Sequence, residues 1–153
     1  MSDIRRGQAT VAVALMGVFL SLYLVLYRLG VYGELVCGSG SCEVVQASTF
    51  SVFLGIPVAA WGLAWYVAVF VTALVQSRRL DAEGPDAKWP GLMLAVLAAG
   101  GLAFSAYLTW IEVGVLHAIC RWCVGSAILT VLIFLGAAPW RALRRSGTAA
   151  PAA

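Results

Sequence analysis

The chain has 153 residues, of which 62% are hydrophobic and 11% are charged, and its mean hydropathy is +0.93. A soluble domain carries about 25% charged residues, so this composition excludes an ordinary soluble protein. The net charge of +3 comes from basic residues that flank apolar stretches, and nothing in it indicates a nucleic-acid partner.

The charged residues are clustered, and long uncharged runs separate the clusters. These runs are residues 7–27, 44–77, 89–111 and 122–140. A bilayer core is spanned by about 20 apolar helical residues, and a helix pairs its own backbone groups inside lipid. The sequence therefore predicts an all-α integral membrane protein, a bundle of four transmembrane helices.

The first helix is expected over residues 8–29, and a glycine- and serine-rich outer loop over 30–43 follows it. The basic residues ahead of this helix are also found ahead of secretory signals. Its apolar stretch is longer than a signal core, however, and no cleavage site follows. We therefore expect an uncleaved transmembrane helix.

The second uncharged run is too long for one span, and Pro57 offers the natural break because proline lacks a backbone donor. We expect residues 43–54 to form a short half-helix across the outer face and residues 57–76 to form the second transmembrane helix. A polar loop follows, and the last two helices are expected over 91–115 and from about 117 to 139.

Lys and Arg residues collect on the cytoplasmic side of membrane proteins, so they indicate the orientation. Eight of the ten lie near the N-terminus, in the central polar loop or in the tail, and Arg28 and Arg121 are the exceptions. We therefore predict that both termini are cytoplasmic. The loop at 30–50 and the turn at 117–121 would then face the exterior or periplasm.

Four cysteines form two close pairs, and the predicted orientation puts both pairs on the outer side. Cys37 and Cys42 flank a glycine- and serine-rich linker, whereas Cys120 and Cys123 form a CxxC motif at the start of the last helix. The N–H groups of a helix N-terminus stabilise a thiolate on the first cysteine of such a motif. Electron transfer by thiol–disulfide exchange is therefore the leading interpretation.

Two other interpretations make the protein non-catalytic. Four thiolates with this spacing can form a closed tetrahedral zinc site. Alternatively, two structural disulfides can brace an extracellular loop. CxxC disulfides at helix starts are usually strained and reducible, which favours the redox interpretation, with no metal at the site.

Further motifs accompany the cysteine pairs: Ser48, Phe53-Leu54-Gly55-Ile56-Pro57 and Trp61-Gly62, ahead of Cys120-Arg-Trp-Cys123. In this order, and over almost the whole chain, they resemble the bacterial homologues of vitamin K epoxide reductase. The resemblance implies a thiol:quinone oxidoreductase of the bacterial inner membrane, whose four-helix bundle surrounds a quinone beneath a capping outer loop and half-helix. The catalytic domain would occupy residues 1–145, ahead of a disordered cytoplasmic tail over 146–153.

The resemblance also implies a path for electrons in disulfide-bond formation. Cys37 would accept electrons from a thioredoxin-like (DsbA-like) protein. Cys42 would exchange with Cys120 through a transient interloop disulfide, and Cys123 would deliver electrons to menaquinone or ubiquinone. The residues expected to line the quinone pocket are Ser48, Pro57, Trp61 and Ser126, each of which also has a packing or capping interpretation.

The sequence departs from the family pattern at two points. Many bacterial members carry a fused thioredoxin-like domain, which is absent from this sequence, so the partner is expected to be a separate protein. Animal members have a tyrosine four positions after the second CxxC cysteine, where Ala127 stands here. This favours a quinone as the usual acceptor and leaves vitamin K epoxide reduction open. DsbB-type quinone reductases place CxxC in the first outer loop, the reverse of the order here.

Two titratable residues near the outer helix ends each have two interpretations. Glu112 is read either as a proton acceptor during quinone reduction or as an interfacial carboxylate. His117 is read either as a group that lowers the pKa of a nearby thiol or as an interfacial residue of a tight turn.

Overall fold

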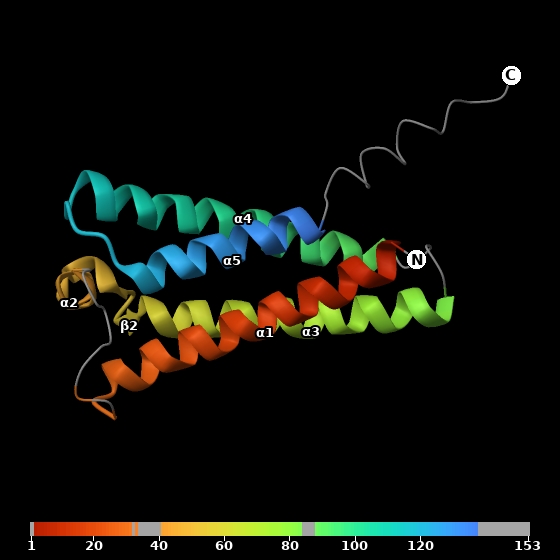
Figure 1. The fold of residues 1–153 in the computed structure, drawn as a ribbon, viewed down its shortest axis with the longest axis horizontal. Coiled ribbons are helices and arrows are strands. Elements are labelled where there is room, and N and C mark those ends of the chain that lie inside the picture. Colours follow the sequence, from red (N-terminus) through yellow and green to blue (C-terminus); the bar gives the residue numbers. More distant parts are fainter. Residues whose placement is uncertain (1, 32, 34–40, 84–87, 138–153) are drawn as a thin grey trace, which may run out of the picture.

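A computed structural model describes residues 2–31, 33, 41–83 and 88–137 of the chain, and the structural statements below concern these residues. Cys37 and the predicted tail over 146–153 lie outside them. Most of the described chain belongs to four long helices that lie side by side as a bundle (Figure 1).

The bundle consists of α1 (Ser2–Arg28), α3 (Val58–Glu83), α4 (Lys88–Gly114) and α5 (Arg121–Ala137). Both α1 and α4 pack against α3 and α5, so the four helices close into a ring around a shared interior. Three of them, α1, α3 and α4, are long and apolar enough to cross a membrane, and α5 is a shorter apolar helix. This arrangement confirms the predicted all-α membrane bundle.

The second long helix extends beyond its predicted bounds. α3 continues past residue 76, through the charged stretch that follows, and ends at Glu83. Arginine and glutamate are good helix formers, and the first strong helix breaker in the sequence is Gly84-Pro85. The hydropathy of the sequence therefore predicted the end of the apolar segment correctly, but the helix continues beyond it to Glu83, the residue before Gly84-Pro85.

The segment between the first two long helices is built differently from the prediction. The helix α2 (Cys42–Ala47) is short, and a 3-10 turn, η1 (Thr49–Ser51), follows it. The strands β1 (Val52–Phe53) and β2 (Ile56–Pro57) then form an antiparallel hairpin. The predicted half-helix over residues 43–54 is therefore wrong in its second half.

The hairpin has a local physical cause. Leu54 and Gly55 connect the two strands, with φ angles of 54° and 78°. A two-residue hairpin loop of this kind requires positive φ at both positions, which glycine adopts without steric cost. The neighbouring valine, phenylalanine and isoleucine are residue types favoured in strands.

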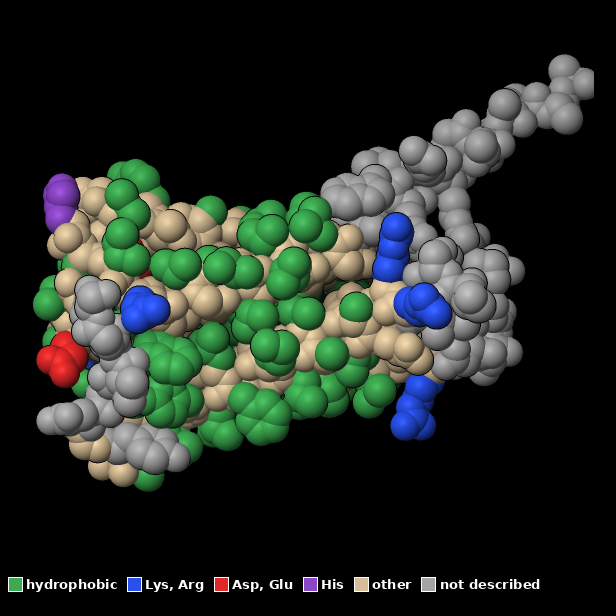
Figure 2. Space-filling model, viewed as in Figure 1, with side chains coloured by type: hydrophobic (Ala, Val, Ile, Leu, Met, Phe, Trp, Pro, Cys, Tyr) green, Lys and Arg blue, Asp and Glu red, His purple; other side chains and the backbone are tan. Residues whose placement is uncertain are grey.

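The two ends of the bundle carry different features. Figure 1 shows α2, the β1–β2 hairpin and the α4–α5 turn (residues 115–120) at one end, which we call the cysteine end, and the N-terminus at the other. In Figure 2, several Lys and Arg side chains gather at the end opposite the cysteine end, and apolar side chains cover the flank. The exposed basic residues described at this opposite end are Arg5 and Arg6 near the start of α1, and Arg78 and Arg79 near the end of α3.

The buried side chains form two clusters along the bundle. The central cluster contains Ala14, Tyr66, Val69, Ala73, Leu94, Ala98 and Ile133. The cluster at the cysteine end contains Leu24, Cys42, Val45, Ala118 and Cys120. Many apolar side chains on the outside of the helices remain exposed, as expected for a surface that faces lipid.

Candidate active site

The CxxC motif lies where α4 turns into α5. Cys120 immediately precedes α5, and its carbonyl accepts the first helical hydrogen bond, from the N–H of Val124 at 3.0 Å. Cys123 lies one helical turn further on, so both side chains point to the same side of the helix. Both are free thiols; Cys120 is fully buried and Cys123 is partly exposed.

The start of α5 favours the thiolate form of Cys120. The pKa of Cys120 is lowered from 9.0 to about 7, chiefly by a hydrogen bond from the Cys123 thiol. The backbone N–H groups of Cys123 and Trp122 lower it further, while burial and the Glu112 carboxylate act in the opposite direction. His117 is exposed, and its Nδ1 lies 3.3 Å from the carbonyl oxygen of Val115, on its own turn.

The lowered pKa predicts how fast Cys120 reacts at different pH values. A thiolate forms as pH rises through the pKa, so the alkylation rate of Cys120 in fully reduced protein should be half-maximal near pH 7. Trypsin cleaves after Arg121 and separates the two CxxC cysteines, so mass spectrometry can follow Cys120 alone. A midpoint near the ordinary value of 9.0 would contradict this assignment.

Cys42 of the first cysteine pair lies near the CxxC motif at the cysteine end. Cys42 is the first residue of α2, is fully buried, is disulfide-bonded, and belongs to the same buried cluster as Cys120. The backbone N–H of Ser41 donates to the carbonyl of Ile119 at 3.3 Å, which ties together the residues that precede the two cysteines. Cys37 lies outside the described residues, so the structure brings together three of the four predicted cysteines.

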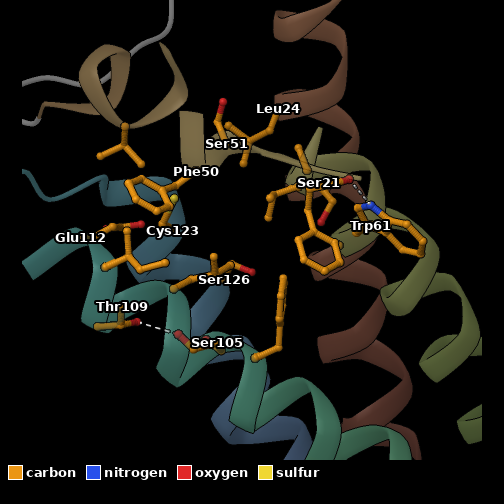
Figure 3. A pocket seen from close by; sticks show the side chains of 18 of the residues that line it. Ser21, Leu24, Phe50, Ser51, Trp61, Ser105, Thr109, Glu112, Cys123 and Ser126 are labelled. Atoms are coloured by element: carbon orange, nitrogen blue, oxygen red, sulfur yellow. Dashed lines mark hydrogen bonds between the residues drawn. The ribbon is translucent and has the colours of Figure 1, made fainter. Parts of the chain in front are cut away.

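A cavity of about 330 Å³ opens among the four helices and is covered by α2, η1 and the hairpin (Figure 3). Its wall is mostly apolar and aromatic, and the Cys123 side chain is part of it, whereas Cys120 is not. Of the residues expected to line a quinone pocket, Ser48, Trp61 and Ser126 line this cavity. Pro57 does not; it pairs with Val52 in the hairpin.

A carboxylate lies beside the two thiols in the cavity wall. Glu112 is 6% exposed, and its Oε2 accepts a hydrogen bond from the backbone N–H of Cys120 at 3.2 Å. The same side chain lies beside the Cys123 thiol, as Figure 3 shows. Glu112 therefore lies inside the bundle, contrary to its interpretation as an interfacial carboxylate.

A sequence model of the vitamin K epoxide reductase family matches residues 8–138. The chain belongs to this family. The family and the apolar helices together make the protein a membrane oxidoreductase. Members of the vitamin K epoxide reductase family act on quinone or vitamin K substrates, which is consistent with an apolar cavity that reaches a CxxC thiol.

One feature of this family member's cavity was missed from the sequence. The Tyr66 side chain is 1% exposed, and its hydroxyl lies 2.9 Å from both the carbonyl and the Oγ of Ser126 and 3.3 Å from the Oγ1 of Thr130. All three residues line the cavity. The available signal was the spacing of Ser126 and Thr130, because polar residues four apart on an apolar helix share a face that turns inward.

Proposed function

We propose that this protein is a membrane thiol:quinone oxidoreductase that oxidises a separate thioredoxin-like (DsbA-like) protein and reduces menaquinone or ubiquinone, thereby supporting disulfide-bond formation. The observation that carries the proposal is the position of Cys123. Its side chain lines a mostly apolar cavity and lies one helical turn from Cys120, which shares a buried cluster with Cys42. A thiol relay therefore reaches from the cysteine end to the cavity.

The proposed relay is a series of thiol–disulfide exchanges that ends at the quinone. Electrons enter at Cys37, pass from Cys42 to Cys120 through an interloop disulfide, and release Cys123 as a thiol. Oxidation of the CxxC dithiol then supplies two electrons and two protons, which convert the quinone to the quinol. A disulfide at Cys42 together with free thiols at Cys120 and Cys123 corresponds to the stage in which the electrons have reached the inner pair.

The cavity suits a quinone in size and chemistry. Ligand sites are typically clefts of about 300–1,000 Å³ with apolar walls and a few polar groups. The polar groups of this wall include Glu112 beside the Cys123 thiol, and Ser126 with Tyr66 and Thr130. The Nε1 of Trp61 donates to the carbonyl of Phe53 at 3.2 Å, which holds the hairpin over the cavity.

The charge distribution supports an orientation with the cysteine end outside. Arg5 and Arg6 near the start of α1, with Arg78 and Arg79 near the end of α3, favour the opposite end as the cytoplasmic one. Arg28 is one of the two basic residues that this orientation puts on the outer side, and it forms a hydrogen bond at the cysteine end. Its Nη1 donates to the carbonyl of Gln46 at 2.8 Å, near the C-terminus of α2. The presence of Arg28 at the cysteine end is therefore explained by this hydrogen bond to α2, and it does not argue against the proposed orientation.

The non-catalytic alternatives receive less support. A cysteine in a disulfide is not a thiolate ligand, so Cys42 in its bonded state does not complete a four-thiolate zinc site. A static brace gives no use to the apolar cavity that the Cys123 side chain lines. Purified protein with one zinc ion per chain, or disulfides that resist a reduced thioredoxin-like protein, would favour these alternatives.

Removal of the Ser126 hydroxyl tests the cavity as the quinone site. Ser126→Ala should raise the KM for quinone about 3- to 10-fold, since a net hydrogen bond contributes about 0.5–1.5 kcal/mol. Rates of quinol formation with a small dithiol as reductant give this value. Ser77→Ala is the control, because Ser77 is likewise a hydrogen-bonded serine inside a long helix, with its Oγ donating to the carbonyl of Leu74, but it does not line the cavity. An unchanged KM in Ser126→Ala, or equal changes in both variants, would argue against this site.

A further inference from the structure

Glu112 is the only carboxylate among the buried polar residues of the described chain. A buried carboxylate is costly unless other groups compensate it, so its surroundings are informative. Its carboxylate accepts a hydrogen bond from the backbone N–H of Cys120 and lies beside the thiol of Cys123, and the side chain also lines the cavity. Glu112 therefore adjoins both members of the CxxC motif and the space proposed for the quinone.

Capping the helix does not by itself require a carboxylate at this position. A neutral serine or asparagine side chain satisfies an N-terminal N–H equally well. Here the negative charge also opposes the Cys120 thiolate, since the Glu112 carboxylate raises the pKa of Cys120. A carboxylate at this position therefore disfavours the thiolate form of Cys120, which a neutral capping residue would not do. Proton transfer is a function that would explain why an ionisable residue is present.

The overall reaction creates a need for such a group. When the Cys120–Cys123 disulfide forms, two thiols lose two electrons and two protons, and the quinone must gain all four to become the quinol. The Cys123 thiol lines the cavity, but the Cys120 side chain is fully buried outside its wall. The protons therefore need an acceptor that contacts the motif and faces the cavity.

We propose that Glu112 is a catalytic proton carrier between the CxxC thiols and the quinone. The inference rests on the proposed thiol:quinone activity. The carboxylate accepts the proton that leaves the Cys123 thiol and gives it to an oxygen of the quinone. The second thiol proton follows the same route after the first has been delivered, and Glu112 ends the reaction in its starting state. Two electrons and two protons thus pass from the dithiol to the quinone.

Other titratable groups at the cysteine end are placed differently. The described charged side chains there, other than Glu112, are Arg28 of α1, Glu43 of α2, His117 of the α4–α5 turn and Arg121 at the start of α5, all exposed. The phenols of Tyr23 and Tyr27 on α1 are partly buried against the cluster at the cysteine end but do not line the cavity. The phenol of Tyr66 on α3 lines the cavity but is bonded to α5 through Ser126 and Thr130. Among the described charged groups at this end, Glu112 is the carboxylate that lies beside a CxxC thiol and lines the cavity.

The test uses the full-length protein with the substitution Glu112→Gln, which keeps an oxygen that can accept the hydrogen bond from Cys120. The rate of quinol formation should fall, whereas the reactivity of Cys120 at a given pH below its midpoint should rise. Quinol formation from reduced protein should fall about 10²-fold, at the lower end of the range for general acid–base catalysis. The pH midpoint for Cys120 alkylation should fall below the wild-type value, since the opposing charge is removed. Glu112→Asp, which restores a carboxylate, should recover part of the rate even if the glutamine variant folds poorly.

The matched control is Glu43→Gln, which removes an exposed carboxylate at the same end and should change neither quantity. Wild-type quinol formation in Glu112→Gln would overturn the carrier role and leave the proposed function intact. A parallel loss of quinol formation and of Cys120 reactivity would indicate a structural role and also overturn it. Wild-type protein that forms no quinol would instead overturn the proposed function on which the inference rests.

Discussion

Replacement of Cys123 by alanine should reduce quinone reduction at least about 10³-fold with every reductant, because the variant loses the cysteine that faces the cavity. The same substitution removes the main cause of the lowered pKa of Cys120, which should therefore rise from about 7 toward 9.0. At pH 7 the thiolate fraction of Cys120 would fall from about one half to about one hundredth. Quinol formation and site-resolved alkylation measure the two effects.

Cys37→Ala provides the contrast for this experiment. It should abolish turnover with a reduced thioredoxin-like protein but keep turnover with a small dithiol that reduces the inner pair directly. This pattern would establish the direction of the relay. Full activity in Cys123→Ala would move the chemistry away from the cavity and contradict the proposed path.

The substitution Gly101→Ala should destabilise the bundle by about 1–3 kcal/mol, the usual cost of overpacking. A Cβ atom at Gly101 would overlap the indole of Trp65. That indole is anchored to α4 by a 3.0 Å hydrogen bond from its Nε1 to the carbonyl of Leu97, and it lines the cavity. Displacement of the Trp65 indole should weaken the packing of α3 against α4 and change the shape of the cavity. Denaturation in detergent, followed by Trp fluorescence, measures the loss of stability.

The adjacent Gly100 supplies a matched control. A Cβ atom there would meet nothing within 4 Å. Alanine also favours a helix over glycine by about 0.5–1 kcal/mol, so Gly100→Ala should be neutral or slightly stabilising. If the two variants have the same stability, close packing of Trp65 on Gly101 does not hold α3 and α4 together.

The sequence was sufficient to predict the four long helices. It was also sufficient to predict that Cys42 and the CxxC motif lie at the same end of the bundle. The gaps between charges identified four apolar segments because a charged side chain in lipid is costly. The order of these segments then put α2 and the start of α5 at the same end of the bundle, as Figure 1 shows. These features depend on local composition and chain direction, which a sequence records directly.

The remaining features depend on contacts between distant residues. Hydropathy alone does not distinguish a half-helix across the outer face from the β1–β2 hairpin, which depends on the conformation at Leu54 and Gly55 and on the pairing of the two strands. Glu112 near a helix end was compatible with the membrane interface until the packing of α4 against α5 buried it. Tyr66 was one aromatic residue among many, and its role depends on Ser126 and Thr130, about 60 residues away along the chain.

The central claim is that the CxxC dithiol reduces a quinone in the cavity. The most direct measurement mixes fully reduced protein in liposomes with menaquinone or ubiquinone in the absence of other reductants. Quinol is then measured by absorbance and the Cys120–Cys123 disulfide by mass spectrometry. We expect one quinol for each Cys120–Cys123 disulfide formed in the first turnover. Quinone that stays oxidised beside reduced protein, or quinol that forms while both thiols remain free, would contradict the claim.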